Sequence, residues 1–275
     1  MKAVTVILAV ACLATHVAAA TASTEACPAA DDQALVAHRG ARAEWPDNTL
    51  AAYQAAVQAG AFAVEVDVRM TADHQLVAMH DPLVNRTTDG HGMVHNLRLE
   101  QVRQLRIITA PQLGVPTLRE VLDQVAQQAV VMLDLKQEGE TYWQALAAEL
   151  TDDPQRHNIV LGVRSLDAAR RLRQLLPQQM QLALSPSKGR VDDFLAAGVS
   201  IVRLWPKWLR QRPQLASLIE QSGAALYLPT SKISPSRVRR LLCYQPRYIQ
   251  TDDPIKLDRT LRQLQAQDQI DAMPQ

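Results

Sequence analysis

Short apolar runs alternate with longer amphipathic segments along most of this 275-residue chain, and this alternation constrains the fold more than any other feature. The runs are rich in β-forming residues, while the segments between them have helical spacing of apolar residues. Nine runs occur, at residues 34–37, 62–68, 76–79, 130–135, 159–163, 182–184, 199–204, 224–228 and 248–249. Strands that alternate with helices form βα units, so the sequence predicts an α/β fold with a parallel sheet.

The third run differs from the others because only residues 69–75 separate it from the second. A parallel neighbour needs a crossover connection of about a dozen residues or more. Residues 76–79 are therefore expected to fold back on the second strand as an antiparallel hairpin arm. Eight strands remain for the parallel set, which is the count of a (β/α)8 TIM barrel, a fold of about 250 residues.

Two helices of this barrel have recognisable first turns. We expect one over residues 50–59, with Asn48 as its N-cap. A second is expected over residues 117–127, because Thr117 and Glu120 have the spacing of a capping box.

One connection is too long for an ordinary βα loop, which has about two to six residues. It covers residues 82–115 and follows the hairpin arm. We expect it to form a small inserted subdomain after the second barrel strand, with a helix over residues 99–105.

Residues 1–20 have the features of a secretory signal peptide: Lys2 at the start, an apolar run, and Ala18-Ala19-Ala20 as a cleavage pattern. The apolar run is shorter than the roughly 20 residues that a membrane-spanning helix needs. The sequence thus predicts export to the periplasm or the medium, with residues 21–275 as a single catalytic domain. An uncleaved N-terminal anchor and a lipoprotein attached at Cys12 stay open as alternatives.

Net charge limits the classes of binding partner, and the cysteine content bears on a disulfide. The formal net charge is +1, or 0 once Lys2 is removed, which predicts no nucleic-acid partner and no anionic membrane partner. No later segment is long and apolar enough for stable membrane insertion. Cys27 and Cys243 remain after cleavage, and export permits a disulfide, so a Cys27–Cys243 bridge and two buried thiols are both open. The oligomeric state is open as well.

The strongest functional signal is Glu65-x-Asp67 in the second run. Side chains two residues apart on a strand point to the same face, so both carboxylates would project into the barrel mouth while the intervening valines face the helices. Two carboxylates at this distance repel each other and need a cation or a shared proton. Oxygen-only ligands indicate a hard divalent cation, Ca²⁺ or Mg²⁺. The alternative is a surface strand with two solvated acids.

Asp134 and Lys136 repeat this spacing in the fourth run. Their side chains are expected to face inward, while the neighbouring leucines face the helices. Asp134 is therefore a candidate third metal ligand, and Lys136 is a candidate for neutralising a phosphate oxygen. The alternative is an ion pair inside the barrel.

His38-Arg39-Gly40 ends the first run, and His80-Asp81 ends the third. Imidazole titrates near neutral pH, so His38 and His80 are candidates for general acid–base catalysis. Arg39 offers a planar guanidinium that suits phosphate. Either histidine alone would more often be structural, but both follow strands whose neighbours carry acids, which favours an active site.

The order and spacing of these motifs resemble the glycerophosphodiester phosphodiesterase family. The matching elements are His38-Arg39-Gly40, Pro46-Asp47-Asn48-Thr49, Gly60, Glu65-x-Asp67, Thr71-x-Asp73, His80-Asp81 and Arg86-Thr87-Thr88. Nearly all of the resemblance lies in residues 36–105. So many elements in one order make a specific pattern, whereas one His-Asp pair would be weak.

This resemblance implies a (β/α)8 barrel of the phosphatidylinositol-phospholipase-C-like type. It also implies hydrolysis of glycerophosphodiesters, as small-molecule substrates, to glycerol 3-phosphate and an alcohol. By matched position, it implies that Glu65, Asp67 and Asp134 hold the divalent cation, that His38 and His80 are the acid–base pair, and that Arg39 and Lys136 contact the phosphate.

Three positions depart from the family pattern. Asp47 stands where the family has Glu before the Asn of its P-E-N-T motif, and residues 226–229 replace a late Trp-Thr-Val-Asn strand. Asp134-Leu135-Lys136 stands where the family has Glu-x-Lys, and spider sphingomyelinase D relatives also carry Asp-Leu-Lys. A phospholipase D acting on lysophospholipid or sphingomyelin is therefore a second hypothesis. A catalytically inactive, phosphodiester-binding barrel is a third.

Overall fold

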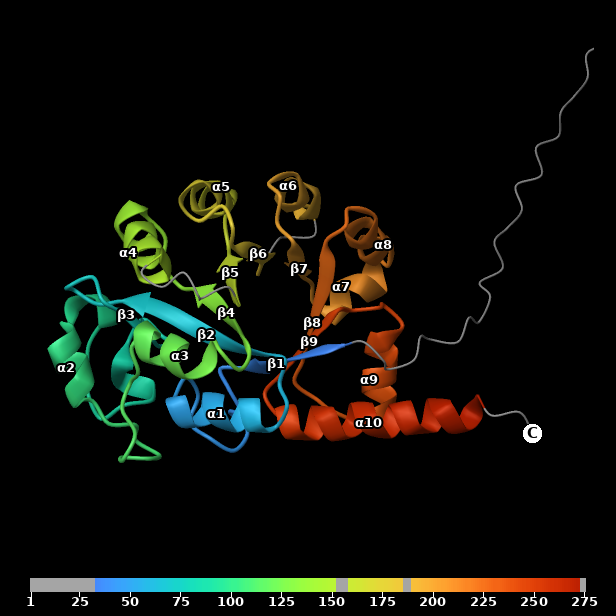
Figure 1. Ribbon diagram of the computed structural model, residues 1–275, viewed down its shortest axis with the longest axis horizontal. Helices are drawn as coiled ribbons and strands as arrows, with labels where there is room; N and C mark the ends of the chain where they lie inside the picture. Colours follow the sequence, from blue (N-terminus) through green and yellow to red (C-terminus); the bar gives the residue numbers. More distant parts are fainter. Residues whose placement is uncertain (1–32, 152–157, 185–188, 273–275) are drawn as a thin grey trace, which may run out of the picture.

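A computed structural model of the protein describes residues 33–151, 158–184 and 189–272. Within these ranges nine strands form one sheet that closes on itself (Figure 1). They are β1 (Ala34–His38), β2 (Ala63–Met70), β3 (Leu76–Ala78), β4 (Val130–Leu135), β5 (Ile159–Val163), β6 (Met180–Ala183), β7 (Ile201–Arg203), β8 (Ala225–Thr230) and β9 (Tyr248–Thr251). The proposed signal peptide and Cys27 lie outside the described residues, so export and the Cys27–Cys243 bridge stay predictions.

The barrel closes because β1 pairs with both β9 and β2. Every neighbouring pair among β1, β2 and β4 to β9 is parallel. The predicted (β/α)8 barrel is confirmed. All eight carboxyl ends therefore meet at one end of the barrel, where TIM barrels carry their functional groups.

The hairpin prediction is also confirmed. β3 pairs antiparallel with the last residues of β2, from Val68 opposite Ala78 to Met70 opposite Leu76. The first residues of β2 pair instead with β1. The eight-residue strand β2 is therefore part of the barrel at its start and part of the hairpin at its end.

Helices surround the barrel between successive strands (Figure 1). They are α1 (Leu50–Gln58), α2 (Leu99–Gln104), α3 (Leu118–Val125), α4 (Glu140–Thr151), α5 (Leu166–Leu175), α6 (Val191–Ala196), α7 (Pro206–Gln211), α8 (Gln214–Gln221), α9 (Pro235–Leu242) and α10 (Pro254–Asp271), with the short 3-10 helices η1 (Val84–Arg86) and η2 (Val94–Asn96). None of these helices has the length and apolar character that crossing a membrane would require.

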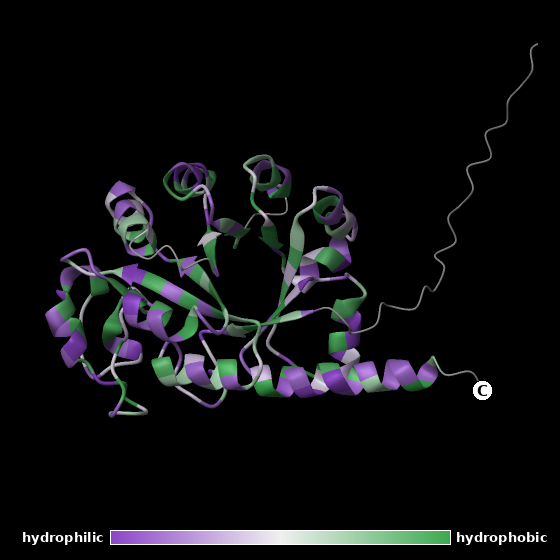
Figure 2. Cartoon of the chain, viewed as in Figure 1, coloured by the Kyte–Doolittle hydropathy of each residue, from purple (hydrophilic) through white to green (hydrophobic). Residues whose placement is uncertain are grey.

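Two apolar layers stabilise the barrel. Val64, Val66 and Val68 of β2 belong to the large buried cluster between the strands and the helices, which also includes Leu118 of α3. A smaller cluster fills the barrel interior; its buried members are Val36, Ala63, Met132, Val160, Leu182, Leu184, Ile201 and Tyr227. Burial of each large side chain contributes about 1.5–3 kcal/mol. Figure 2 shows the hydrophobic colour on most strands, hydrophilic stretches on β2, and mostly hydrophilic colour on α10.

Residues 82–115 contain η1, η2 and α2, which begins and ends within one residue of the expected helix. Their apolar residues, which include Val84, Val94 and Val102, form one buried cluster with Val77 and Met79 of the hairpin arm. The segment lies beside the β2–β3 hairpin, at one edge of the barrel (Figure 1).

The cap predicted for α1 is wrong by one residue. The N-cap is Thr49, whose hydroxyl accepts a hydrogen bond from the backbone N–H of Ala52. Asn48 has φ +58°, in the left-handed region, and is buried. The capping box predicted at Thr117 and Glu120 is present.

Gly162 in β5 allows Leu184 and the neighbouring strand β4 to pack closely against it. A Cβ added there would lie 2.5 Å from Leu184 Cδ1 and 2.7 Å from the carbonyl oxygen of Leu133. Because one of these atoms is backbone of the neighbouring strand, Gly162→Ala should cost about 1–3 kcal/mol of unfolding free energy, measured by urea denaturation. Gly189→Ala is the control, since a Cβ there meets nothing within 4 Å. Equal urea midpoints for the two variants would contradict this account.

Candidate active site

Three carboxylates meet at the carboxyl end of the barrel, as the sequence predicted. Glu65 and Asp67 come from β2, and Asp134 comes from β4 at the position paired with Asp67. Each offers an oxygen, and these oxygens lie within 4.8 Å of one another. All three residues are at most 4% exposed. A solvated surface strand is therefore excluded.

Asp67 is neutralised by two cations. Lys136 Nζ lies 2.8 Å from its Oδ1, and Arg39 Nε lies 3.1 Å from its Oδ2. Burial alone would raise the pKa of Asp67, but Lys136 and Arg39 outweigh burial and hold this pKa below its usual range. Asp67 is thus an ionised, fully buried carboxylate.

Asp134 is neutralised in the same way. Lys136 Nζ lies 2.5 Å from its Oδ2 and so bridges Asp134 and Asp67. The guanidinium of Arg164, just after β5, donates to both carboxylate oxygens of Asp134, with Nη2 at 2.8 Å from Oδ1 and 2.6 Å from Oδ2. The predicted inward direction of Asp134 and Lys136 is confirmed, and so is the ion pair between them.

Glu65 has no such partner among the described side chains. Its Oε2 accepts the backbone N–H of Arg39 at 3.0 Å, and the nearest cationic candidate, His38 Nε2, lies 3.9 Å away. Burial, with added repulsion from Asp67 and Asp134, raises the pKa of Glu65 well above its usual value. This uncompensated carboxylate, beside two others, fits a bound hard cation, since oxygen is the ligand that Ca²⁺ and Mg²⁺ prefer.

Asn48 holds Asp67 in place from the α1 side. Its Nδ2 donates to Asp67 Oδ2 at 2.7 Å, while its Oδ1 accepts the Asp67 backbone N–H at 3.1 Å and the Tyr53 hydroxyl at 2.8 Å. Asn48 has a left-handed backbone, with φ +58°, and its side chain links β2 to Tyr53 of α1.

His38 ends β1 next to Glu65, its paired residue on β2. Its Nδ1 lies 2.6 Å from Oδ1 of Asp252, the residue that follows β9. The hydrogen bond with His38 lowers the pKa of Asp252, although partial burial opposes this. Sequence reasoning missed Asp252, and its place three residues after the last apolar run was the available signal.

His80 has a matching arrangement after β3. Its Nδ1 lies 2.7 Å from Oδ1 of Asp81, and Arg86 binds the other oxygen of that carboxylate. Burial lowers the pKa of His80, and Asp81 opposes this. Both histidines therefore have an aspartate at Nδ1, which orients the ring and leaves Nε2 as the free nitrogen.

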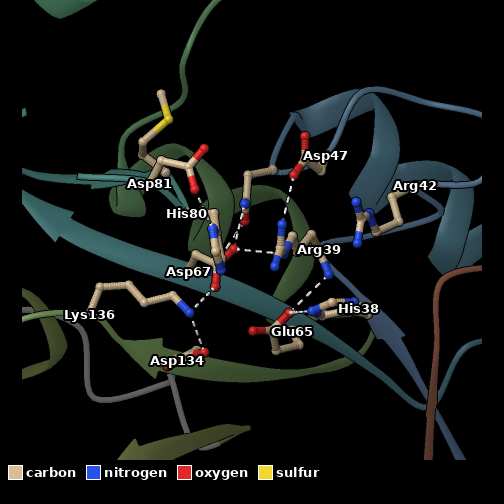
Figure 3. A network of polar contacts seen from close by, with 12 residues as sticks. His38, Arg39, Arg42, Asp47, Glu65, Asp67, His80, Asp81, Asp134 and Lys136 are labelled. Atoms are coloured by element: carbon tan, nitrogen blue, oxygen red, sulfur yellow. Dashed lines mark hydrogen bonds and ion pairs between the residues drawn. The ribbon is translucent and has the colours of Figure 1, made fainter. Parts of the chain in front are cut away.

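Figure 3 shows both imidazoles beside the carboxylates, with Arg39 and Lys136 among them. Arg39 also binds Asp47, with Nη1 3.0 Å from Oδ2, and Arg86 lies 3.3 Å from the same oxygen. Burial would raise the pKa of Asp47, but Arg39 and Arg86 lower it.

The seven residues that the sequence analysis proposed for the site lie together. Arg164, which binds Asp134, is a further member that sequence reasoning missed.

Comparison with known proteins identifies one family. The model of the glycerophosphoryl diester phosphodiesterase family matches residues 38–255. A glycerophosphodiester phosphodiesterase from Caldanaerobacter subterraneus is 26% identical over 241 residues, an alignment that covers 83% of this chain and 97% of that protein. Mouse glycerophosphodiester phosphodiesterase 1 is 36% identical over 136 residues, which are 46% of this chain and 41% of the mouse protein.

Solved structures agree with the fold. A glycerophosphodiester phosphodiesterase from Agrobacterium tumefaciens superposes with a TM-score of 0.70 at 25% identity, covering 82% of this chain and 98% of that one. An Oleispira antarctica phosphodiesterase, solved in complex with the product sn-glycerol-3-phosphate, gives a TM-score of 0.76 at 23% identity, covering 84% and 97%.

The Asn48 contacts predict a measurable loss of stability. Asn48→Gly keeps the left-handed backbone accessible but leaves the Asp67 N–H and the Tyr53 hydroxyl without their acceptor. We expect a loss of about 1–3 kcal/mol in unfolding free energy, measured by urea denaturation. Tyr53→Phe, which removes one of these bonds and leaves no buried donor behind, should lose less. Wild-type stability in Asn48→Gly would show that the network does not hold Asp67.

Proposed function

Because this chain belongs to the glycerophosphoryl diester phosphodiesterase family, we propose that it hydrolyses glycerophosphodiesters to glycerol 3-phosphate and an alcohol. The observation that carries the proposal is the arrangement of two histidines, each bonded to an aspartate at Nδ1, beside three buried carboxylates. The product bound in the Oleispira antarctica relative is consistent with it.

Glu65, Asp67 and Asp134 would hold a divalent cation, Ca²⁺ or Mg²⁺. When bound, the cation would stabilise the negative charge that grows on the phosphoryl oxygens. Lys136 and Arg164 bind Asp134, and Lys136 with Arg39 holds the pKa of Asp67 below its usual range, so both carboxylates are positioned as ligands.

Arg39 and Lys136 would also contact the phosphate. Both are cationic and lie at the carboxylate cluster, with side chains about nine-tenths buried. Positive charge in a water-poor site stabilises the developing charge more strongly than it would in water. Arg39 is held by Asp47, so its guanidinium is oriented before the substrate arrives.

His38 and His80 would move the protons. With Nδ1–H donated to Asp252 and Asp81, each imidazole keeps Nε2 for the reaction. One Nε2 takes the proton of the attacking hydroxyl, which is water or the 2-hydroxyl of glycerol, and the other protonates the leaving alkoxide. Attack by the 2-hydroxyl would give a cyclic phosphate that water then opens.

A phospholipase D acting on lysophospholipid or sphingomyelin is the second candidate. The Asp134-Leu135-Lys136 sequence favours it.

An exported protein, cleaved after about residue 20, would meet either kind of substrate outside the cytoplasm. N-terminal sequencing of the protein purified from culture would test export.

Loss of either histidine should abolish most turnover. We expect His38→Ala and His80→Ala each to lower kcat for glycerophosphocholine by about 100-fold or more, since each removes one proton transfer. His95→Ala is the matched control, because this exposed histidine lies in η2 outside the site, and it should keep wild-type kcat. Near-normal turnover in both active-site variants would refute the two-histidine mechanism.

Choline release separates the two substrates. The proposed function predicts that the purified protein releases choline from glycerophosphocholine at a higher kcat/KM than from sphingomyelin or lysophosphatidylcholine. EDTA should abolish the activity, and added Ca²⁺ or Mg²⁺ should restore it. Preference for sphingomyelin would support the phospholipase D, and no turnover of any diester with either cation would support an inactive binding barrel.

A further inference from the structure

A cavity of about 470 Å³ has His38 in its lining. It is bounded by the carboxyl ends of β7, β8 and β9 and by helices α7 and α9. His38 and Asp252 form the wall that it shares with the proposed catalytic centre. A substrate whose phosphate lies at the carboxylates could therefore extend one of its ends into this cavity.

The charge of this cavity is strongly one-sided. Five cationic side chains line it: Arg203, Lys207, Arg210, Arg237 and Arg240. Asp252 is the one carboxylate in its lining, and His38 and Arg42 already bind Asp252. Within residues 33–151, 158–184 and 189–272, none of the five cations has a carboxylate oxygen within 4 Å. Their charge is therefore available to a ligand.

Two buried hydrogen-bond donors in this region could bind a ligand oxygen directionally. Gln250 lines the cavity, is 4% exposed, and its Nε2 has no hydrogen-bond partner in the described part of the chain. Gln250 is paired with Val36, whose side chain fills the barrel interior, so both side chains point inward. The buried Nε of Arg203 also lacks a hydrogen-bond acceptor there. A buried donor without an acceptor is destabilising, and an acceptor oxygen on a ligand would satisfy it.

Trp205 supports the arginine at the cavity wall. The Arg203 guanidinium carbon lies 5.1 Å from the centroid of the Trp205 ring, within the range of a cation–π contact. Such stacking orients the planar guanidinium and leaves its N–H edge for a carboxylate or phosphate.

We propose that this cavity binds a second anionic group, a phosphate or a carboxylate, on the alcohol part of the diester. The inference rests on the proposed function and specifies its substrate class: glycerophosphodiesters with an anionic alcohol. Choline and ethanolamine are cations, which five positive charges disfavour. Glycerol is uncharged and would not use them.

Two matched pairs of substrates test this. Glycerophosphoinositol 4-phosphate differs from glycerophosphoinositol by one phosphate, and glycerophosphoserine differs from glycerophosphoethanolamine by one carboxylate. In each pair we expect kcat/KM to be about tenfold higher or more for the anionic member, mainly through a lower KM, because charge-assisted hydrogen bonds bind the added group. The preference should shrink as salt rises, because the cavity is open to solvent.

Variants on α9 connect this preference to the cavity. In Arg237→Gln/Arg240→Gln, the ratio of kcat/KM within each pair should fall severalfold toward one. Arg239→Gln is the matched control: Arg239 lies on the same helix but binds Asp268 and does not line the cavity, so the ratio should stay at its wild-type value.

The outcomes separate the inference from the proposed function. Hydrolysis of all four diesters with no preference for the anionic members would overturn the inference and leave the function standing. The same holds if the double variant keeps the wild-type ratio. Hydrolysis of none of the diesters, with cation present, would overturn the proposed function itself. A preference for the phosphate pair alone would narrow the ligand to a phosphate, and one for the carboxylate pair alone would narrow it to a carboxylate.

Discussion

Repulsion among three buried carboxylates is the constraint on which the site depends. Oxygens of Glu65, Asp67 and Asp134 lie within 4.8 Å of one another at a place that water hardly reaches. Charges this close in a medium of low dielectric cannot all persist without counter-charge. Lys136 and Arg164 with Arg39 provide it for the two aspartates. Glu65 is left with a raised pKa, and this residual imbalance is what a divalent cation would correct.

Strand periodicity made much of this predictable. Side chains alternate between the two faces of β2 and β4, so the sequence positions of Glu65, Asp67 and Asp134 predict that they point inward. The short interval before β3 likewise excluded a parallel pairing and identified the hairpin. These predictions depend only on local spacing, so they were correct without knowledge of which strands become neighbours.

Contacts made by barrel closure were not predictable in the same way. Asp252 follows β9 and gains its role because β9 closes against β1, which brings its carboxylate to His38 across 214 positions of sequence. Arg164 is a lone charged residue after β5, and its partner is known only once β5 lies beside β4. Asn48 was read as a helix cap because the sequence does not reveal its left-handed backbone. The sequence pattern therefore predicted which side chains belong to the site, whereas their contact partners depend on how the barrel closes.

Calorimetric titration of Ca²⁺ or Mg²⁺ into the EDTA-treated protein tests the central claim most directly, because it measures binding without depending on any substrate. The account predicts saturable binding of cation in the wild type, with release of protons as Glu65 ionises. Glu65→Gln should lose this proton release and most of the affinity, and Asp134→Asn should weaken binding as well. Absence of cation binding, or equal binding in the wild type and both variants, would contradict it.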